Sequence, residues 1–380
     1  MRTIYSGFDN LDVSYKGHIS DAFLAKLEDA KARAIEVRSE ILIEHGGIRM
    51  HVAESGGAGG YPFRCDTGPL GGTWFFRRPN PKDPWTIRFS AKSLTVSQFG
   101  VDGTRAQIED TLHALGCMLH PNPESIGRVD FAVDILAPGF ELQPDNFVLH
   151  ARMGRSDHAE VDTIQSHGRS GRYTSVTAGT KNRRQVIVYD KRLEVTNKPL
   201  KAPWFKIWEV EMTRRGIKPL NFKDRHEGAV WRVEARAGKQ CLKDQHDVTS
   251  WSDLHREIKT IFETVLDKIR YTHPNADTNR SRWPEHRFWD LARAEVSRIE
   301  LDRTGLLDQE RILEASRVAQ AELLRQQLVG LAASEAALTA RNDDDPARAA
   351  VETLQETIRS NGEQFRESFE RAKGRYAHFK

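Results

Sequence analysis

The chain has 380 residues, of which 38% are hydrophobic and 29% are charged, and its formal net charge is +3. No apolar run approaches the ~20 residues that a transmembrane helix needs, and the N-terminus lacks a signal-peptide core, so we expect a cytoplasmic protein without membrane contact. The three cysteines are sparse and lack metal-ligand spacing, which favours a reducing compartment over a disulfide framework. They are Cys65, Cys117 and Cys241.

The first half of the chain mixes expected helices with short expected strands. Apolar residues recur at helical spacing in 20–45, and 104–118 and 145–153 are also expected to be helical. The glycine-rich stretch at 55–60 lacks the Gly-Lys-Ser/Thr ending of a phosphate-binding loop and is interpreted as a flexible hairpin connection. Strands bounded by glycine- and proline-rich turns are expected at 47–54, 73–78 and 84–90.

The second half begins with strands and ends in a long helical region. A loop rich in Gly, Ser and Arg is expected at 166–172. Helical patterns follow at 203–215 and 247–270, and from about residue 285 Ala, Leu, Glu, Arg and Gln dominate. Expected strands lie at 128–135, 173–178, 185–190 and 231–236, and the late helices at 286–341 and 346–375 are expected to form a hairpin.

Strands and helices intermix over the first 300 residues, so we predict an α+β fold with an α-helical C-terminal region. The sheet is expected to be mixed or antiparallel and to consist of strand-helix-strand units. Residues 301–380 hold 12 basic and 14 acidic side chains, which leaves the rest of the chain net basic. The C-terminal helices are expected to serve dimer or partner contacts, and the alternative is a self-contained helical tail.

Three of the expected strands each present an apolar back and a polar front, because side chains alternate along a strand. If these strands share one sheet, a tyrosine, a lysine, carboxylates and arginines converge on one surface. Such an inventory suits metal-assisted phosphodiester chemistry with tyrosine as the nucleophile. The polar fronts hold Arg128, Asp130 and Asp134, then Tyr189 and Lys191, then Arg232, Glu234 and Arg236.

The segments 127–134, 186–191 and 231–234, with Glu194 behind the second, resemble the rolling-circle replication initiators of the Rep_trans type and their relatives, the MobT conjugative relaxases. The resemblance implies a mixed sheet with the active site on its open face. It also implies that Tyr189 nicks one DNA strand, keeps the 5′ phosphate as a phosphotyrosine ester and leaves a free 3′-OH. We add Lys191 and Arg232 to the catalytic set.

A hard divalent cation, Mg²⁺ or Mn²⁺, is expected to neutralise the phosphate and to take oxygen ligands. Asp130 and Glu234 are the first candidate ligands. Asp134 comes third, because it lies four residues from Asp130 on the same strand. At ~3.3 Å per residue the two are about 13 Å apart, too far to bind one ion unless the strand bends. The alternative for each carboxylate is a salt bridge across the sheet to Arg128, Arg232 or Arg236. The absence of a His-hydrophobic-His motif agrees with a carboxylate-based site.

Two side chains are expected to tune Tyr189, whose phenol has an ordinary pKa near ~10. Lys191 is expected to lower that pKa or to hold the scissile phosphate, and Glu194 to orient Lys191. The alternative is that Tyr189 has no catalytic role and is an amphipathic side chain on a sheet surface.

Basic side chains gather around Tyr189 and are expected to bind DNA phosphates, although a solvated charged surface is the alternative. The helical segment 247–290 is the candidate reader of the origin sequence. The predicted DNA-binding residues are Arg128, Arg169, Arg172, Lys181, Arg183, Arg184 and Arg236.

Three functions remain open from the sequence: a replication initiator, a relaxase that nicks a transfer origin, and a non-catalytic DNA-binding regulator. We predict a nicking domain at 1–240, a helical DNA-recognition region at 241–300 and a helical extension at 301–380. The expected partners are DNA as an origin hairpin or single strand, and a second copy of the chain. The resemblance adds a host helicase.

Overall fold

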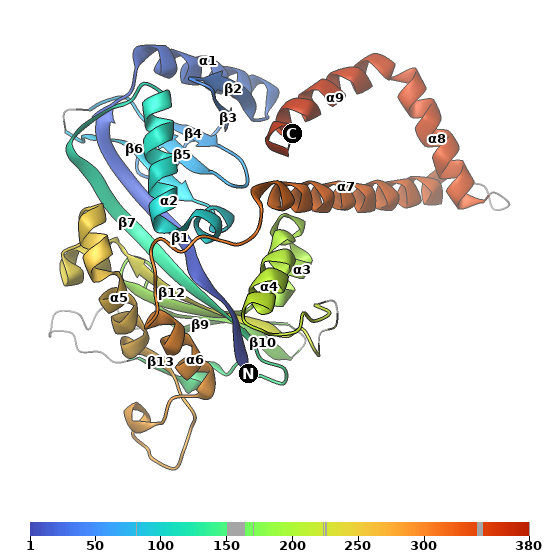
Figure 1. Ribbon diagram of the computed structural model, residues 1–380. Coiled ribbons are helices and arrows are strands. Elements are labelled where there is room, and N and C mark those ends of the chain that lie inside the picture. The colour runs from blue at the N-terminus through green and yellow to red at the C-terminus, as the bar shows by residue number, and fades with distance from the viewer. Residues whose placement is uncertain are drawn as a thin grey trace.

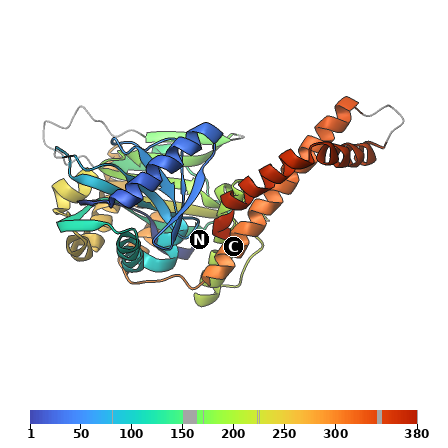
Figure 2. The same cartoon turned by 90° about the horizontal axis from the view of Figure 1, so that it is seen from above.

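The computed structural model describes residues 1–80, 82–149, 164–169, 171–222, 224, 226–339 and 345–379. A long, twisted sheet forms the body, helices pack against both of its faces, and a helical arm projects from one side (Figure 1; Figure 2). Among the described helices, none combines the length and the apolar composition needed to cross a membrane.

The described strands of the main sheet number eleven, all neighbours are antiparallel, and their order is β2-β3-β4-β5-β6-β1-β7-β12-β11-β10-β9. Strands β8 (Phe147–Leu149) and β13 (Ile269–Tyr271) form a separate pair. The main sheet contains β1 (Arg2–His18), β2 (Ile41–His45), β3 (Ile48–Val52), β4 (Phe63–Asp66), β5 (Gly72–Phe76), β6 (Trp85–Ala91), β7 (Met118–Leu136), β9 (Ile164–Arg169), β10 (Arg172–Gly179), β11 (Arg184–Asp190) and β12 (Val230–Gly238).

Local sequence signals start several helices. Ser20 caps the first, Asp190 caps the third, and Ser250 forms a capping box with Asp253 at the fifth, so orphan backbone N–H groups find acceptors. The helices are α1 (Asp21–Val37), α2 (Ser93–Ala114), α3 (Lys191–Asn197), α4 (Pro203–Arg214), α5 (Trp251–Lys268), α6 (Arg287–Val296), α7 (Gln309–Thr339), α8 (Pro346–Ser360) and α9 (Gly362–Arg375). Short helical turns lie at Pro144–Asn146 (η1), Pro199–Lys201 (η2), Cys241–Gln245 (η3), Arg280–Arg282 (η4) and Ala377–Phe379 (η5).

The two faces of the sheet bury different cores. The larger core lies between the sheet and α1, α2, α5 and α6, and it takes the apolar back of β7, β11 and β12. The smaller core lies under α3, α4 and the start of α7, where Trp204 and Trp208 are buried against Ile4 and Tyr5. The polar front of the three strands therefore faces α3 and α4.

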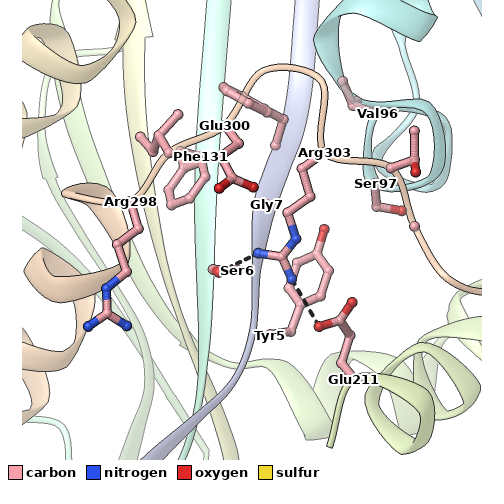
Figure 3. Close-up of a pocket in the computed structure, with 14 residues that line it drawn as sticks. Tyr5, Ser6, Gly7, Val96, Ser97, Phe131, Glu211, Arg298, Glu300 and Arg303 are labelled. Atoms are coloured by element: carbon pink, nitrogen blue, oxygen red, sulfur yellow. Dashed lines mark hydrogen bonds and ion pairs between the residues drawn. The ribbon is translucent and has the colours of Figure 1, made fainter. Parts of the chain in front are cut away.

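A strap at 297–308 connects α6 to α7 across β1 and α2. Val101 N donates to Leu301 O at 3.1 Å, and the Arg303 guanidinium donates to Ser6 Oγ at 3.1 Å and to Glu211 Oε2 at 2.9 Å (Figure 3). The cavity beside these groups has a volume of about 20 Å³, which is room for little more than one water molecule. These contacts fix the base of the arm.

The α+β prediction and its helical C-terminal region are confirmed, and the units join in one antiparallel sheet. Helices α4 and α5 and strands β10, β11 and β12 lie close to their expected positions. The expected helix at 286–341 is divided into α6 and α7 by the strap at 297–308, and the expected helix at 346–375 is divided into α8 and α9. The 55–60 stretch connects β3 to β4, as interpreted from the sequence.

Three other expectations about elements were wrong, and one strand was missed. Strand β1 was not expected at all, and the expected helix at 20–45 ends at Val37, where Arg38 adopts a left-handed φ of 50° and the chain turns into β2. The segment 166–172 is not a loop, because 164–169 forms β9 beside β10. Residues 147–149 pair with β13 as a strand instead of a helix, and 150–153 lie outside the described residues.

Candidate active site

The three polar strands lie side by side, with β12 between β7 and β11. Residues directly opposite each other on neighbouring strands share one face of a sheet. The register places Tyr189 opposite Arg232 and Arg232 opposite Asp134, and it places Arg236 opposite Asp130. The convergence predicted from alternation is therefore seen on the front face.

The Tyr189 hydroxyl lies within reach of an acid and an amine. It donates to Glu234 Oε2 at 3.4 Å, and Lys191 Nζ donates to its oxygen at 3.4 Å. Burial raises the pKa of Tyr189 well above its ordinary value, although Arg232 opposes the shift. Loss of solvent thus outweighs the nearby cations, and the expected role of Lys191, to lower this pKa or to hold the scissile phosphate, stays a prediction.

The carboxyl group of Glu234 has a pKa close to neutral pH. Burial, together with the neighbouring charges of Asp9 and Asp130, raises the pKa of Glu234 to about 7. A group with such a pKa exchanges protons efficiently at neutral pH. It is also the carboxylate in contact with the Tyr189 hydroxyl, so the phenol has a proton acceptor beside it.

Lys191 lies just beyond β11, as the first residue of α3, and its side chain is 1% exposed. Its ammonium donates to Glu194 Oε2 at 2.6 Å and lies 5.0 Å from the centre of a Trp204 ring. Burial and the positive charge of Arg232 lower the pKa of Lys191. Burial favours the neutral form of Glu194, but Lys191 outweighs it and lowers the pKa of Glu194 to about 2. Glu194 thus holds Lys191, as expected.

Arg232 and Asp134 form a fully buried pair. Arg232 donates to both Asp134 oxygens, at 2.6 and 2.7 Å, and Trp208 Nε1 donates to the same carboxylate at 2.8 Å. A third donor atom of Arg232 contacts Asp9. Asp134 therefore forms the salt bridge that was expected as the alternative to metal binding. The pair also holds Arg232 opposite Tyr189.

The other acids of the front face also lie between arginines. Arg128 contacts both oxygens of Asp130, one of them at 2.9 Å, and Arg236 reaches Asp130 at 3.3 Å. Arg236 also donates to Glu234 Oε1 at 3.0 Å. Carboxylates and guanidinium groups thus alternate across β7 and β12.

Asp9 belongs to this cluster and was missed in the sequence. The pairing of β1 with β7 slips between Phe8 and Asn10, which makes Asp9 part of a β-bulge. The bulge turns Asp9 toward Arg232 while Phe8 and Leu11 remain in the larger core. Simple alternation has no signal for such a turn, and β1 itself was not expected.

The predicted DNA-binding residues lie in four places. Arg128 and Arg236 are in the acid–arginine cluster, and Arg172 approaches Asp190 at 3.6 Å beside the Tyr189 end of β11. Arg169 lies on the edge strand β9. Lys181, Arg183 and Arg184 occupy the turn at the other end of β11, where Arg183 and Arg184 donate to Gln240 and Gln245. The structure therefore does not bring all seven to one surface.

The residues do not fit the divalent cation that the resemblance implies. Within the described part of the chain, no group of three or more His, Cys, Asp or Glu side chains is arranged to hold a metal ion. Asp130 and Asp134 accept hydrogen bonds from arginine through both oxygens, and Glu234 accepts from Arg236 and Tyr189. Guanidinium groups supply the positive charge in this arrangement.

No protein-family model matches the chain, and no curated protein matches it significantly. Among solved structures, the fold is similar to that of a rolling circle replication initiator protein from Geobacillus stearothermophilus, with 14% sequence identity and a TM-score of 0.37 over 79% of this chain and 99% of that chain.

Proposed function

We propose that this protein nicks one strand of DNA to initiate rolling-circle replication, with Tyr189 as the nucleophile. The observation that carries the proposal is the Tyr189 hydroxyl between Glu234 and Lys191, each at 3.4 Å, at the end of β11, an interior strand of the sheet. A tyrosine on a sheet surface has no need of a buried lysine and a carboxyl group near neutrality. A tyrosine that must lose its proton and attack phosphorus needs both.

The reaction follows from these contacts. Glu234 takes the phenol proton, and the Lys191 ammonium stabilises the phenolate that forms. The phenolate oxygen attacks phosphorus, and the bond from phosphorus to the 3′ oxygen breaks. The proton returns from Glu234 to the departing 3′ oxygen, which leaves a 3′-OH and a 5′-phosphotyrosine. The ester preserves the energy of the broken bond, so the reverse reaction closes the strand.

Arginines of the cluster are the proposed charge partners of the scissile phosphate. Arg128 lies at the rim of the cluster and is partly exposed, whereas Arg232 is fully enclosed. A guanidinium group can bind two phosphate oxygens at once. We propose that Arg128 and Arg236 turn from Asp130 and Glu234 to the phosphate, while Arg232 keeps the tyrosine in place. A requirement for Mg²⁺ or Mn²⁺ remains a prediction of the resemblance, and no step above uses a cation.

The partners are proposals as well. DNA would be bound as an origin hairpin or single strand, by a homodimer in the cytoplasm that recruits a host helicase. Exposed apolar side chains along α7, α8 and α9 support self-association. A conjugative relaxase would run the same reaction at a transfer origin, and the two functions differ in the DNA that is recognised.

A nicking assay on supercoiled DNA tests the proposal. Plasmids that carry either a replication origin or a transfer origin from the genetic neighbourhood of this gene serve as substrates, and a plasmid with neither is the control. We expect conversion to open circles at one position of the replication origin, with a 3′-OH that a polymerase extends. DNA binding without any nick would instead indicate a non-catalytic regulator.

A further inference from the structure

A cleft of about 560 Å³ opens between the front of the sheet and the end of the chain. Its lining includes Asp9 and Arg128 from the active site, Lys201 from η2, and Arg375, His378 and Phe379 from the C-terminal segment. Figure 1 shows how α8 and α9 bring the C-terminus back from the tip of the arm to the body. Residues far apart in the sequence therefore wall one cleft beside the nicking site.

The C-terminal segment, residues 374–379, packs against specific residues of the sheet. His51 Nε2 lies 2.8 Å from Gly374 O, and the rings of His51 and His378 meet edge to face at 4.5 Å. Gly68 leaves room for this contact, because a Cβ atom there would lie 2.8 Å from the His378 ring. The left-handed φ of +93° at Gly68 also favours glycine. The segment is thus held as a wall of the cleft.

Positive charge along the cleft exceeds its uncommitted negative charge. Three carboxylates line the cleft: Asp9 is paired with Arg232, Asp66 is paired with Lys92 at 2.7 Å, and Glu40 has no ion pair among the described residues. Within the part of the chain that the structure describes, neither Lys201 nor Arg375 has a carboxylate within ion-pair distance. Two basic side chains from separate elements, with Arg128 near the active site, match the regular charges of a nucleic-acid backbone.

The cleft also offers a surface for bases. Phe379 and His378 line it at the C-terminal side. Nucleobases stack on aromatic side chains when they are unpaired, and a groove with positive charge and such platforms is the usual design for single strands. A volume of about 560 Å³ falls in the range of about 300–1,000 Å³ typical of ligand pockets, which suits a narrow single strand better than a duplex.

We propose that this cleft binds the single-stranded DNA that leads into the nicking site, with the C-terminal segment as its outer wall. The proposal rests on the nicking function and extends it. Arg128, Lys201 and Arg375 contact successive phosphates, and Phe379 stacks on a base. An acidic peptide would use the same cations but would gain nothing comparable from the partly exposed Phe379 ring.

Full-length Tyr189→Phe protein allows binding to be measured without cleavage. The probe is a short fluorescein-labelled oligothymidine, and fluorescence anisotropy gives its Kd over a range of salt concentrations. Lys201→Ala and Arg375→Ala should each weaken binding and reduce the slope of log Kd against log salt by about 0.7. Phe379→Ala should raise Kd about tenfold or more with an unchanged slope.

Matched variants on α9 are the controls. Arg371→Ala removes a cation whose partner is Glu367, and Phe369→Ala removes an exposed ring, and neither residue lines the cleft. Both should bind the oligonucleotide as the parent does. Parental Kd and slope in all three cleft variants would overturn the proposal, as would a loss confined to an acidic peptide or to duplex DNA.

The failure of this proposal can be told from the failure of the nicking function. If the native chain nicks its origin but the cleft variants bind single strands normally, nicking stands and the cleft assignment is wrong. If no nick forms but the cleft variants lose single-strand binding, the cleft assignment stands and nicking is wrong.

Discussion

At the scale of single residues, the exchange of a proton between Tyr189 and Glu234 is the main chemical claim. Glu234→Gln keeps the size of the side chain and removes its ability to take a proton. We expect the single-turnover nicking rate to fall by about 10²–10⁴ with little change in DNA affinity. Quenched time courses on an oligonucleotide give the rate.

Glu209→Gln, on the exposed side of α4, is the matched control for Glu234→Gln and should nick at the parental rate. A Glu234→Gln rate within a few-fold of the parent would remove the base from the mechanism. Recovery of the variant by high Mn²⁺ would assign Glu234 to a cation instead.

The pair between Glu194 and Lys191 makes a prediction about stability. The folded protein lowers the pKa of Glu194 from 4.5 to about 2, so the charged form contributes stability that is fully present above pH 4.5 and is lost as the pH falls toward 2. Glu194→Gln should lower the free energy of unfolding at pH 7 by about 3 kcal/mol.

Urea unfolding of the parent and of Glu194→Gln between pH 7 and pH 3 measures this difference. The gap should stay constant down to about pH 4.5 and shrink below it. Glu314→Gln, which breaks an exposed pair with Arg317, should leave stability unchanged. A gap that grows as the pH falls would contradict the assigned ion pair.

Side-chain alternation predicted the positions of Tyr189, Arg232, Glu234, Asp130 and Asp134 on one face, because their strands turned out to be neighbours. It could not decide between a bound cation and salt bridges to arginine for these acids, since most of the pairs depend on the register across strands. Alternation could not identify Asp9 for a different reason. A β-bulge at Asp9 breaks the two-residue period on which alternation relies.

At the scale of elements, the turn between β10 and β11 is the proposed non-specific DNA contact. Arg183 and Arg184 lie there, at the end of β11 away from Tyr189. The double variant Arg183→Ala/Arg184→Ala should weaken origin and non-origin duplex alike and reduce the salt slope by about two units. Anisotropy titrations on both duplexes at several salt concentrations measure this.

Arg348→Ala/Arg359→Ala on the exposed face of α8 is the charge-matched control for the turn, and its salt slope should equal that of the parent. A turn variant that lost only its preference for the origin, with the slope unchanged, would mean that the turn reads sequence.

Helices were predicted better than strands, for a physical reason. The apolar faces of α4 and α5 repeat within a run of consecutive residues, so a short window of sequence reveals them. Strands β1 and β8 pair with distant parts of the chain: β1 pairs with β6 and β7, and β8 pairs with β13 more than a hundred residues later. The pattern of apolar residues within a short segment does not reveal such distant strand pairing.

At the scale of the whole molecule, the arm of α7, α8 and α9 leaves apolar side chains in solvent. Leu331 is 70% exposed and Leu338 is 87% exposed, both on α7. The arm carries charges of both signs in nearly equal number, which suits contact with a second copy of itself. We expect sedimentation velocity to show a homodimer.

Leu331→Glu/Leu338→Glu should shift the sedimentation of the protein to that of a monomer without changing its helix content. Gln327→Glu, also exposed on α7, is the control and should remain dimeric. A monomeric parent at all concentrations would contradict the predicted homodimer, and a dimeric double variant would place the interface elsewhere.

A covalent link between Tyr189 and the 5′ phosphate of the nicked strand is the most direct test of the proposed function. The native protein and a labelled origin strand are incubated, denatured and separated on a gel, and the adduct is mapped by mass spectrometry. We predict an adduct on the peptide containing Tyr189, an equal yield for Tyr173→Phe, whose ring is 41% exposed on β10, and none for Tyr189→Phe. An adduct that persists in Tyr189→Phe, or that maps to Tyr173, would contradict the assignment of Tyr189 as the nucleophile.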